Sequence, residues 1–219
     1  MAELTLVIGN KNYSSWSLRP WLLLKQAGIP FREVYIPTHT PQSRAAILKH
    51  SPAGRVPVLH DGNISVWESL AICEYLAEQY PDKQLWPADR TARALARSVA
   101  TEMHAGFTAL RTHMVMNCRK NFPGKGRTPE VEADLERLRG LWTDCRTRYG
   151  SGGDFIFGLF SIADAMYAPV ATRFKTYDVA LDKVAAAYRD TILALPAMRQ
   201  WYTDAAAERE VIDEYEQRV

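Results

Sequence analysis

Hydrophobic and polar residues follow two different periods in the first eighty residues. Apolar runs over 5–8 and 56–60 predict strands, and so do the alternating segments 31–36 and 64–67. Apolar residues at helical spacing predict helices after residue 18, near 43–49 and over 68–80. In the last helix Ser69, Ile72, Cys73 and Leu76 share one face. Since Asp61-Gly62-Asn63 has turn chemistry, residues 56–67 form a hairpin and the predicted order is β-α-β-α-β-β-α.

Beyond Pro81 the strand pattern ends. Two prolines within 81–87 predict a linker, and the residues that follow are rich in strong helix formers. We predict helices over 90–119, 130–149, 183–195 and 197–216, with loops at 121–127 and 150–158. A buried helix after Ser161 is also expected, because Ser161 and Asp164 match the capping-box pattern. The domains would be an α/β domain at 1–80, a linker at 81–89 and an all-α domain at 90–219.

Composition excludes several classes of function. The 219 residues contain 27 Lys and Arg against 25 Asp and Glu, so no broad positive field favours nucleic-acid binding. No apolar run approaches the ~20 residues of a membrane span, and the first residues lack the pattern of a signal peptide. We therefore expect a cytoplasmic protein that binds neither membranes nor nucleic acid.

The three cysteines, Cys73, Cys118 and Cys145, are few and far apart. They form neither a disulfide framework nor a metal site, and no metal is expected. Thiol chemistry would then come from a small molecule or from an isolated cysteine.

Four motifs in this order resemble the glutathione S-transferase superfamily. They are the segment Ser14-Ser15-Trp16-Ser17-Leu18-Arg19, the segment Arg55-Val56-Pro57-Val58-Leu59, the segment Glu68-Ser69-Leu70-Ala71-Ile72, and the capping box at 161–164. The resemblance covers essentially the whole chain, and the double serine is most similar to the zeta class and related bacterial serine-type enzymes. It implies a thioredoxin-like first domain with a mixed four-stranded sheet, a helical-bundle second domain, and a detoxifying homodimer.

The resemblance also implies which residues bind the co-substrate glutathione. A cis bond between Val56 and Pro57 would turn the polar backbone groups of Val56 toward this peptide. Ser69, at a helix N-terminus, suits the γ-glutamyl carboxylate, and Glu68 could accept from the ammonium group; without the family, both could simply cap the helix. The expected glutathione-binding residues are Ser14, Ser15, Trp16, His39, Arg55, Val56, Pro57, Glu68 and Ser69.

A serine hydroxyl at the first helix would stabilise the glutathione thiolate. Lowering a thiol pKa by about two units requires roughly 2.7 kcal/mol. One hydrogen bond to charged sulfur and a helix N-terminus supply about that much. We favour Ser15, with Ser14 next and the Tyr13 hydroxyl as a further candidate. Pro20 is comfortable only in a first turn, which leaves open a helix capped by Ser17 with Ser14 and Ser15 in a loop.

The leading hypothesis is a transferase that conjugates glutathione to a small apolar electrophile. Trp16 stands where the zeta class has cysteine, which weakens the alternative of a maleylacetoacetate-type isomerase and favours a conjugating enzyme over a disulfide reductase. A non-catalytic interaction module is the alternative from another class. The acceptor site is expected between the domains, and its candidates are Tyr13, Met103, His104, Phe107 and Arg111. Met103, His104, Phe107 and Arg111 share one predicted helix face, and for each of them taken singly, packing of that face against its neighbours is the simpler explanation.

Overall fold

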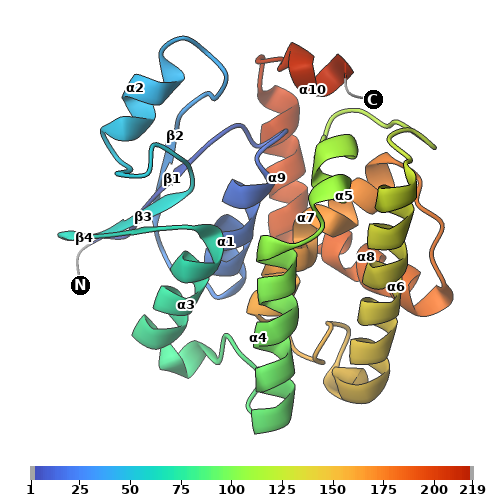
Figure 1. Ribbon diagram of the computed structural model, residues 1–219. Helices are drawn as coiled ribbons and strands as arrows, with labels where there is room; N and C mark the ends of the chain where they lie inside the picture. The colour runs from blue at the N-terminus through green and yellow to red at the C-terminus, as the bar shows by residue number, and fades with distance from the viewer. Residues whose placement is uncertain (1–2, 218–219) are drawn as a thin grey trace.

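The computed structural model describes residues 3–217, an α/β domain followed by a helical domain (Figure 1). The strands of the first domain are β1 (Thr5–Ile8), β2 (Arg32–Tyr35), β3 (Val58–Asp61) and β4 (Ile64–Trp67), and its helices are α1 (Ser15–Gln26), α2 (Ser43–Leu48) and α3 (Ser69–Gln79). The predicted β-α-β-α-β-β-α order is confirmed. The strand order is β2-β1-β3-β4; β1 is parallel to β2, and the other two pairings are antiparallel.

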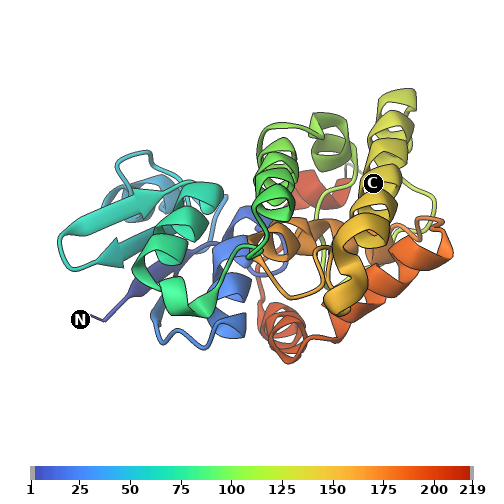
Figure 2. The ribbon, with the colours of Figure 1, turned by 90° about the horizontal axis from the view of Figure 1, so that it is seen from below.

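Side chains of β1 alternate between the two faces of the sheet, as the period of a strand requires. Leu6 and Ile8 join the main core with α1 and α3, whereas Val7 packs in a smaller cluster with Ile47 of α2. Figures 1 and 2 show α1 and α3 on the side of the sheet that faces the helical domain. The N-terminus of α1 is thereby held at the junction of the two domains.

Seven helices of the described chain form the second domain. They are α4 (Arg90–Ala105), α5 (Thr108–His113), α6 (Pro129–Tyr149), α7 (Ile162–Thr176), α8 (Lys183–Ala194), α9 (Pro196–Ala207) and α10 (Asp213–Gln217), with the 3-10 turns η1 (Pro81–Lys83) and η2 (Gly150–Gly152). Helix α7 is buried along nearly its whole length and packs against α1, α4 and α8. No helix within residues 3–217 is long and apolar enough to cross a membrane.

The capping box at the start of α7 is confirmed. The Asp164 carboxylate accepts from the backbone N–H and the hydroxyl of Ser161 at 2.8 and 3.1 Å. It also accepts from the Ile156 N–H and the Tyr188 hydroxyl, both at 3.0 Å. One buried carboxylate therefore ties α7, α8 and the preceding loop together.

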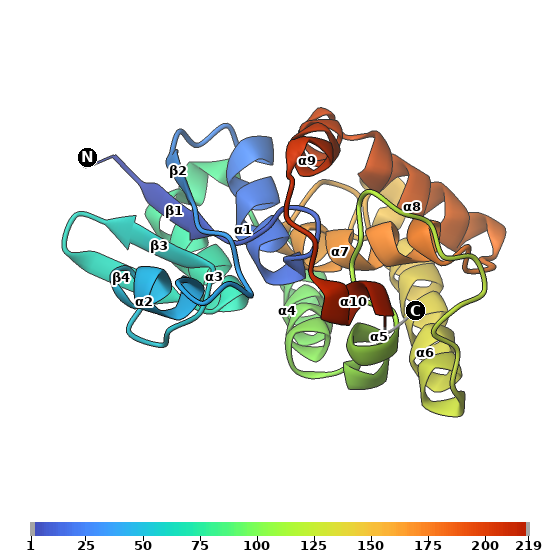
Figure 3. The same ribbon diagram turned by 90° about the horizontal axis from the view of Figure 1, so that it is seen from above.

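Two helices that the sequence pattern joins are broken in the structure. The predicted helix over 90–119 stops at Ala105, and Phe107 adopts a left-handed conformation with φ of 55°. The predicted helix over 197–216 stops at Ala207, and the backbone of Glu208 is extended. The helix ends there because the Glu208 carboxylate accepts from the backbone N–H groups of Lys11 and Asn12 at 2.5 and 3.0 Å. Figure 3 shows the following segment returning to place α10 beside α5.

The structure shows which serine caps the first helix, a choice between Ser17 and the earlier serines that the position of Pro20 left open. Ser14 is the N-cap, and its Oγ accepts from the Ser17 N–H at 3.3 Å. A cap at Ser17 is wrong, since Pro20 lies inside the helix and not in its first turn. Ser14 and Ser15 thus lie at the helix terminus itself.

Candidate functional site

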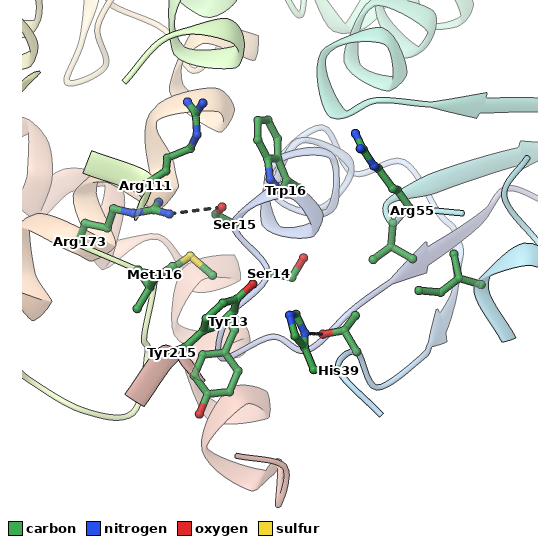
Figure 4. A pocket seen from close by; sticks show the side chains of 14 residues that line it. Tyr13, Ser14, Ser15, Trp16, His39, Arg55, Arg111, Met116, Arg173 and Tyr215 are labelled. Carbon is green, nitrogen blue, oxygen red and sulfur yellow. Dashed lines mark hydrogen bonds between the residues drawn. The ribbon is translucent and has the colours of Figure 1, made fainter. Parts of the chain in front are cut away.

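Two adjoining cavities lie where α1 meets the helical domain. The first is about 480 Å³ and the second about 460 Å³, and Trp16, Arg55, Val56 and Arg111 line both. Figure 4 shows the first cavity, with Ser14, Ser15 and Trp16 at its centre. The α/β domain contributes one wall and the helical domain the other, so an occupant of this cleft contacts both domains.

The two serines at the start of α1 differ in their hydrogen bonds. The Ser14 hydroxyl donates to Ser17 Oγ at 2.8 Å, and Ser17 Oγ also accepts from the Gly9 N–H at 3.1 Å. The buried Ser15 hydroxyl instead accepts from Nη2 of Arg173 on α7 at 3.5 Å. Since a hydroxyl has one proton, that of Ser14 is engaged within its own helix turn, whereas the Arg173 contact leaves the proton of Ser15 to another acceptor.

Arg173 is a buried cation that no carboxylate pairs with in the described chain. Its Nε donates to the Met114 carbonyl at 2.7 Å and its Nη1 to the Pro169 carbonyl at 3.3 Å. Burial lowers its pKa to about 10, which still leaves the guanidinium charged near neutral pH. Arg173 is not among the residues predicted from the sequence. Its position as a lone arginine within the mostly apolar run 162–174 is the signal that could have identified it.

Two further guanidinium groups lie close to the indole of Trp16. The Arg19 Cζ lies 4.2 Å from the centre of the indole and the Arg111 Cζ 5.5 Å from it, while the His104 ring approaches edge-on at 5.4 Å. Positive groups over an indole face are attracted by its quadrupole. Trp16, which lines both cavities, therefore keeps two positive charges close to the boundary between them.

Arg19 is fully buried behind the second cavity. Its Nη1 donates to Ser69 Oγ at 3.4 Å, and its Nε and Nη2 have no hydrogen-bond partner. Burial, followed by repulsion from Arg173, lowers its pKa to about 9. A buried cation with unsatisfied donors next to Ser69 makes this corner of the cleft attractive to an anion.

The second cavity contains the predicted residues of the third strand and the third helix. Pro57, which follows a cis bond from Val56, lines it together with Trp67, Glu68 and Ser69. Glu68 has a φ of 69°, a left-handed value that is uncommon for this residue type and turns the chain into α3. Its Oε2 lies 3.6 Å from His104 Nε2, and burial together with Arg19 lowers the pKa of His104, so the pair is not charged on both sides at neutral pH.

The far side of the first cavity is closed by the C-terminal segment. Tyr215 of α10 packs edge-on against Tyr13 at 5.7 Å and against His39 at 5.0 Å. The Tyr13 hydroxyl donates to Glu216 Oε1 at 2.6 Å and accepts from Arg119 Nη2 at 3.1 Å. Tyr13 therefore uses its hydroxyl to hold the segment over the cavity.

The predicted acceptor residues separate into four groups. Tyr13 lines the first cavity and His104 the second, Arg111 lines both, and Met103 and Phe107 belong to the hydrophobic core. The expectation of one continuous face fails because the helix ends before Phe107. Several lining residues were not predicted: Thr38, Ile47, Trp67, Val115, Met116, Arg173 and Tyr215.

The cysteines lie outside both cavities. Burial raises the pKa of Cys118 to about 12 and that of Cys145 to about 11, and it also raises the pKa of Cys73. None of them is a thiolate near neutral pH. Among residues 3–217 no group of three or more His, Cys, Asp and Glu side chains could hold a metal ion.

Both parts of the chain are similar to known proteins. The family model described as glutathione S-transferase, N-terminal domain, matches residues 13–79, and the one described as glutathione S-transferase, C-terminal domain, matches 128–204. A Caenorhabditis elegans protein named "Probable maleylacetoacetate isomerase" is 30% identical over 165 residues, which cover 73% of this chain and 75% of that protein. Glutathione S-transferase Z2 of Arabidopsis thaliana is 27% identical over 73% of this chain and 74% of its own.

Solved structures give the same picture of the fold. A glutathione transferase homologue from Burkholderia, solved with bound glutathione, superposes with a TM-score of 0.71. It is 24% identical in sequence, and the match covers 94% of this chain and 100% of that one. At this level of identity the likeness concerns the fold.

Proposed function

The chain belongs to the glutathione S-transferase family of enzymes, and from this premise we propose that it binds glutathione in the cleft, stabilises the thiolate with a serine hydroxyl and adds it to a small electrophile. The single observation that carries this proposal is the Ser15 hydroxyl at the N-terminus of α1, which accepts from Arg173 and keeps its own proton available. The remaining residues are assigned around it.

Glutathione would lie along the α/β wall of both cavities. In this proposal its γ-glutamyl carboxylate meets Ser69 at the N-terminus of α3, with Arg19 behind, and its ammonium group meets Glu68. The backbone of Val56 pairs with the cysteinyl residue, and Arg55 and His39 receive the glycine carboxylate. Support comes from the charges of these residues and, except for the buried Arg19, from their position as cavity lining.

Ser15 is our proposed thiolate donor for two reasons. Its proton is not used by Arg173, whereas Ser14 donates to Ser17. The Arg173 charge directly behind Ser15 also favours an anion in front of it. A hydrogen bond to a charged group contributes about 1.5–3 kcal/mol and a helix N-terminus about 0.3–1, which meets the roughly 2.7 kcal/mol needed to lower a thiol pKa by about two units.

No cysteine of the protein competes for this role. All three have raised pKa values because of burial, so the reactive sulfur in the proposal is that of glutathione. A disulfide reductase that forms a mixed disulfide through a first-helix cysteine has no residue to use at Trp16.

A glutathione-dependent isomerase of the maleylacetoacetate type is the second candidate. It is favoured by the similarity to the C. elegans relative with that name. The same thiolate would add reversibly to a double bond and leave after rotation. A non-catalytic interaction module is disfavoured, because such a protein has no use for a cleft lined by paired hydroxyls and unpaired guanidinium groups.

Ultraviolet titration of the thiolate tests the proposal. Glutathione bound to the protein should ionise about two pH units below free glutathione, and conjugation of a reactive aryl halide should follow the same pH profile. Absence of glutathione binding would reject both enzymatic candidates. Binding with an unchanged thiol pKa would reject the thiolate role of the serine.

We further propose a cytoplasmic homodimer. The strand β4 forms one edge of the sheet and exposes Ile64 and Trp67, with relative exposures of 50% and 43%. Large apolar side chains on an edge strand favour a covering partner. Light scattering after size-exclusion chromatography tests the oligomeric state.

A further inference from the structure

The helical-domain wall of the first cavity carries positive charge and apolar surface together. Arg111 and Arg173 stand there beside Val115 and Met116. Arg55 faces them from the α/β wall (Figure 4). Among the described residues that line this cavity there is no Asp or Glu. An uncharged electrophile would leave this concentration of cations without an anionic partner.

Arg111 is bound only by neutral groups in the described chain. Its guanidinium donates to the carbonyls of Gly106 and Met103 and, at 3.4 Å, to the hydroxyl of Thr108. Asp134, whose negative charge acts on Arg111, accepts from the Leu110 N–H at 2.9 Å and forms no ion pair with Arg111 within residues 3–217. The half-buried positive charge of Arg111 therefore has no anionic partner among the described residues and would be stabilised by an anionic ligand.

The negatively charged groups of glutathione are all assigned to residues other than Arg111. In the proposed binding mode the γ-glutamyl carboxylate is served by Ser69 with Arg19 behind, the glycine carboxylate by Arg55, and the thiolate by Ser15 with Arg173 behind. Arg111 is then left over. It lies on α5 where the two cavities adjoin, in the helical-domain wall that faces the α/β residues assigned to glutathione.

We infer that the second substrate is an anion, an apolar electrophile that carries a carboxylate, and that Arg111 binds this carboxylate. The inference rests on the proposed function and narrows its substrate class. Val115 and Met116 would contact the apolar body of the substrate. Because an arginine meets a carboxylate with two parallel hydrogen bonds, Arg111 would fix the orientation of the electrophilic carbon toward the thiolate as well as contribute affinity.

In this inference the reacting group of the substrate is an activated double bond. The glutathione sulfur forms a bond to the β-carbon of an enone, the π electrons move onto the carbonyl oxygen as an enolate, and the enolate takes a proton from water. The carboxylate is unchanged in this step. Its role is to be held by Arg111 while the carbon–sulfur bond forms.

A matched pair of compounds tests the inference by binding alone. Benzylacetone and its para-carboxylate derivative have the same apolar body, and neither reacts with thiols. Calorimetry should give about tenfold tighter binding of the carboxylate, as expected for one charge-assisted contact. In Arg111→Met this preference should fall to about one, whereas the exposed Arg199 on α9 offers a control, since Arg199→Met should retain it.

The corresponding enones separate this inference from the proposed function. Benzylideneacetone and its para-carboxylate derivative should both be conjugated, with kcat/KM about tenfold higher for the carboxylate. Conjugation without that preference, or a preference that survives Arg111→Met, overturns the inference alone. Tighter binding of the carboxylate with no conjugation of either enone overturns the transferase proposal and supports the anion site. Since Arg111→Met could perturb α5, Arg111→Lys is the second variant, and it should restore part of the preference.

Discussion

Arg173 on α7 donates from Nη2 to Ser15 Oγ at the start of α1, at 3.5 Å, across 158 residues of sequence. The bond fixes the polarity of the hydroxyl, since an oxygen that accepts from a guanidinium has its proton directed elsewhere. It also brings a positive charge next to the position proposed for the thiolate. The helical domain thereby contributes to a site whose sequence motif lies entirely in the α/β domain.

Ser15→Ala should raise the pKa of protein-bound glutathione by about 1–2 units, because one hydrogen bond to a charged sulfur is lost. The thiolate absorbance of the complex measures this shift directly. Ser14→Ala is the matched control: it removes the helix cap and should lower the midpoint of thermal unfolding with a smaller effect on the thiol. A larger thiol shift in Ser14→Ala than in Ser15→Ala would transfer the role to Ser14.

Arg173→Gln should also raise the pKa of the bound thiol, since the cation behind Ser15 is removed. Arg173→Lys keeps a charge and should restore part of the shift. The two variants are compared at equal stability, adjusted by temperature, because Arg173 also donates to Met114 and Pro169. Equal thiol pKa values in Gln and Lys variants would show that the charge is not responsible.

Glutathione affinity should decrease as the pH falls far enough to protonate His104. Burial and Arg19 hold the pKa of His104 below its usual value, so the ring is uncharged at pH 7. At lower pH the protonated ring competes for Glu68 and repels the ammonium group of the γ-glutamyl residue. Calorimetry between about pH 7 and 5 measures the change.

His104→Gln should remove this part of the pH dependence and leave the remainder. The lowered pKa of His104 also predicts how folding stability changes with pH. A base whose pKa is lowered by folding binds fewer protons in the folded state, so the stabilising contribution is present at neutral pH and is lost as the pH falls through the folded-state pKa. If glutathione affinity in His104→Gln followed the same pH profile as in the wild type, His104 would not be the group responsible for the pH dependence.

Asp164→Ala should destabilise the protein by at least about 3 kcal/mol, since each buried donor left unpaired costs about 1–3 kcal/mol. Four donors lose their acceptor: two from Ser161, one from Ile156 and one from Tyr188. Urea unfolding measures the loss. Thr128→Ala, which removes the cap of α6 and one exposed hydrogen bond to Glu130, is the comparison and should cost about 1 kcal/mol.

Ile64→Lys should convert the proposed dimer into monomers, because it places a charge on the exposed edge strand β4. Leu48→Lys is the matched control. Leu48 ends α2 and is as exposed as Ile64, at 49% against 50%. Light scattering distinguishes the outcomes, and a dimer that persists in Ile64→Lys would place the interface elsewhere.

The sequence by itself determined the features that depend on neighbouring residues. The strand at 5–8, the hairpin about Gly62 and the buried face of α3 follow from local periodicity and turn chemistry, and all three are present. The capping box at Ser161 and Asp164 is equally local, with both partners within one helical turn. Such features need no knowledge of distant residues.

The tertiary structure decided what distant residues impose. The helix beyond Ala207 ends because Glu208 meets the backbone of Lys11 and Asn12, and Trp16 is surrounded by Arg19 from its own helix and Arg111 from α5. Nothing in the local pattern at Arg173 indicates Ser15 as its partner. The sequence could therefore predict which residues carry the chemistry of the serine motif. The positive wall of the cleft exists only because α7 packs against α1 and Arg111 of α5 lies against Trp16, which buries charges that no local pairing satisfies.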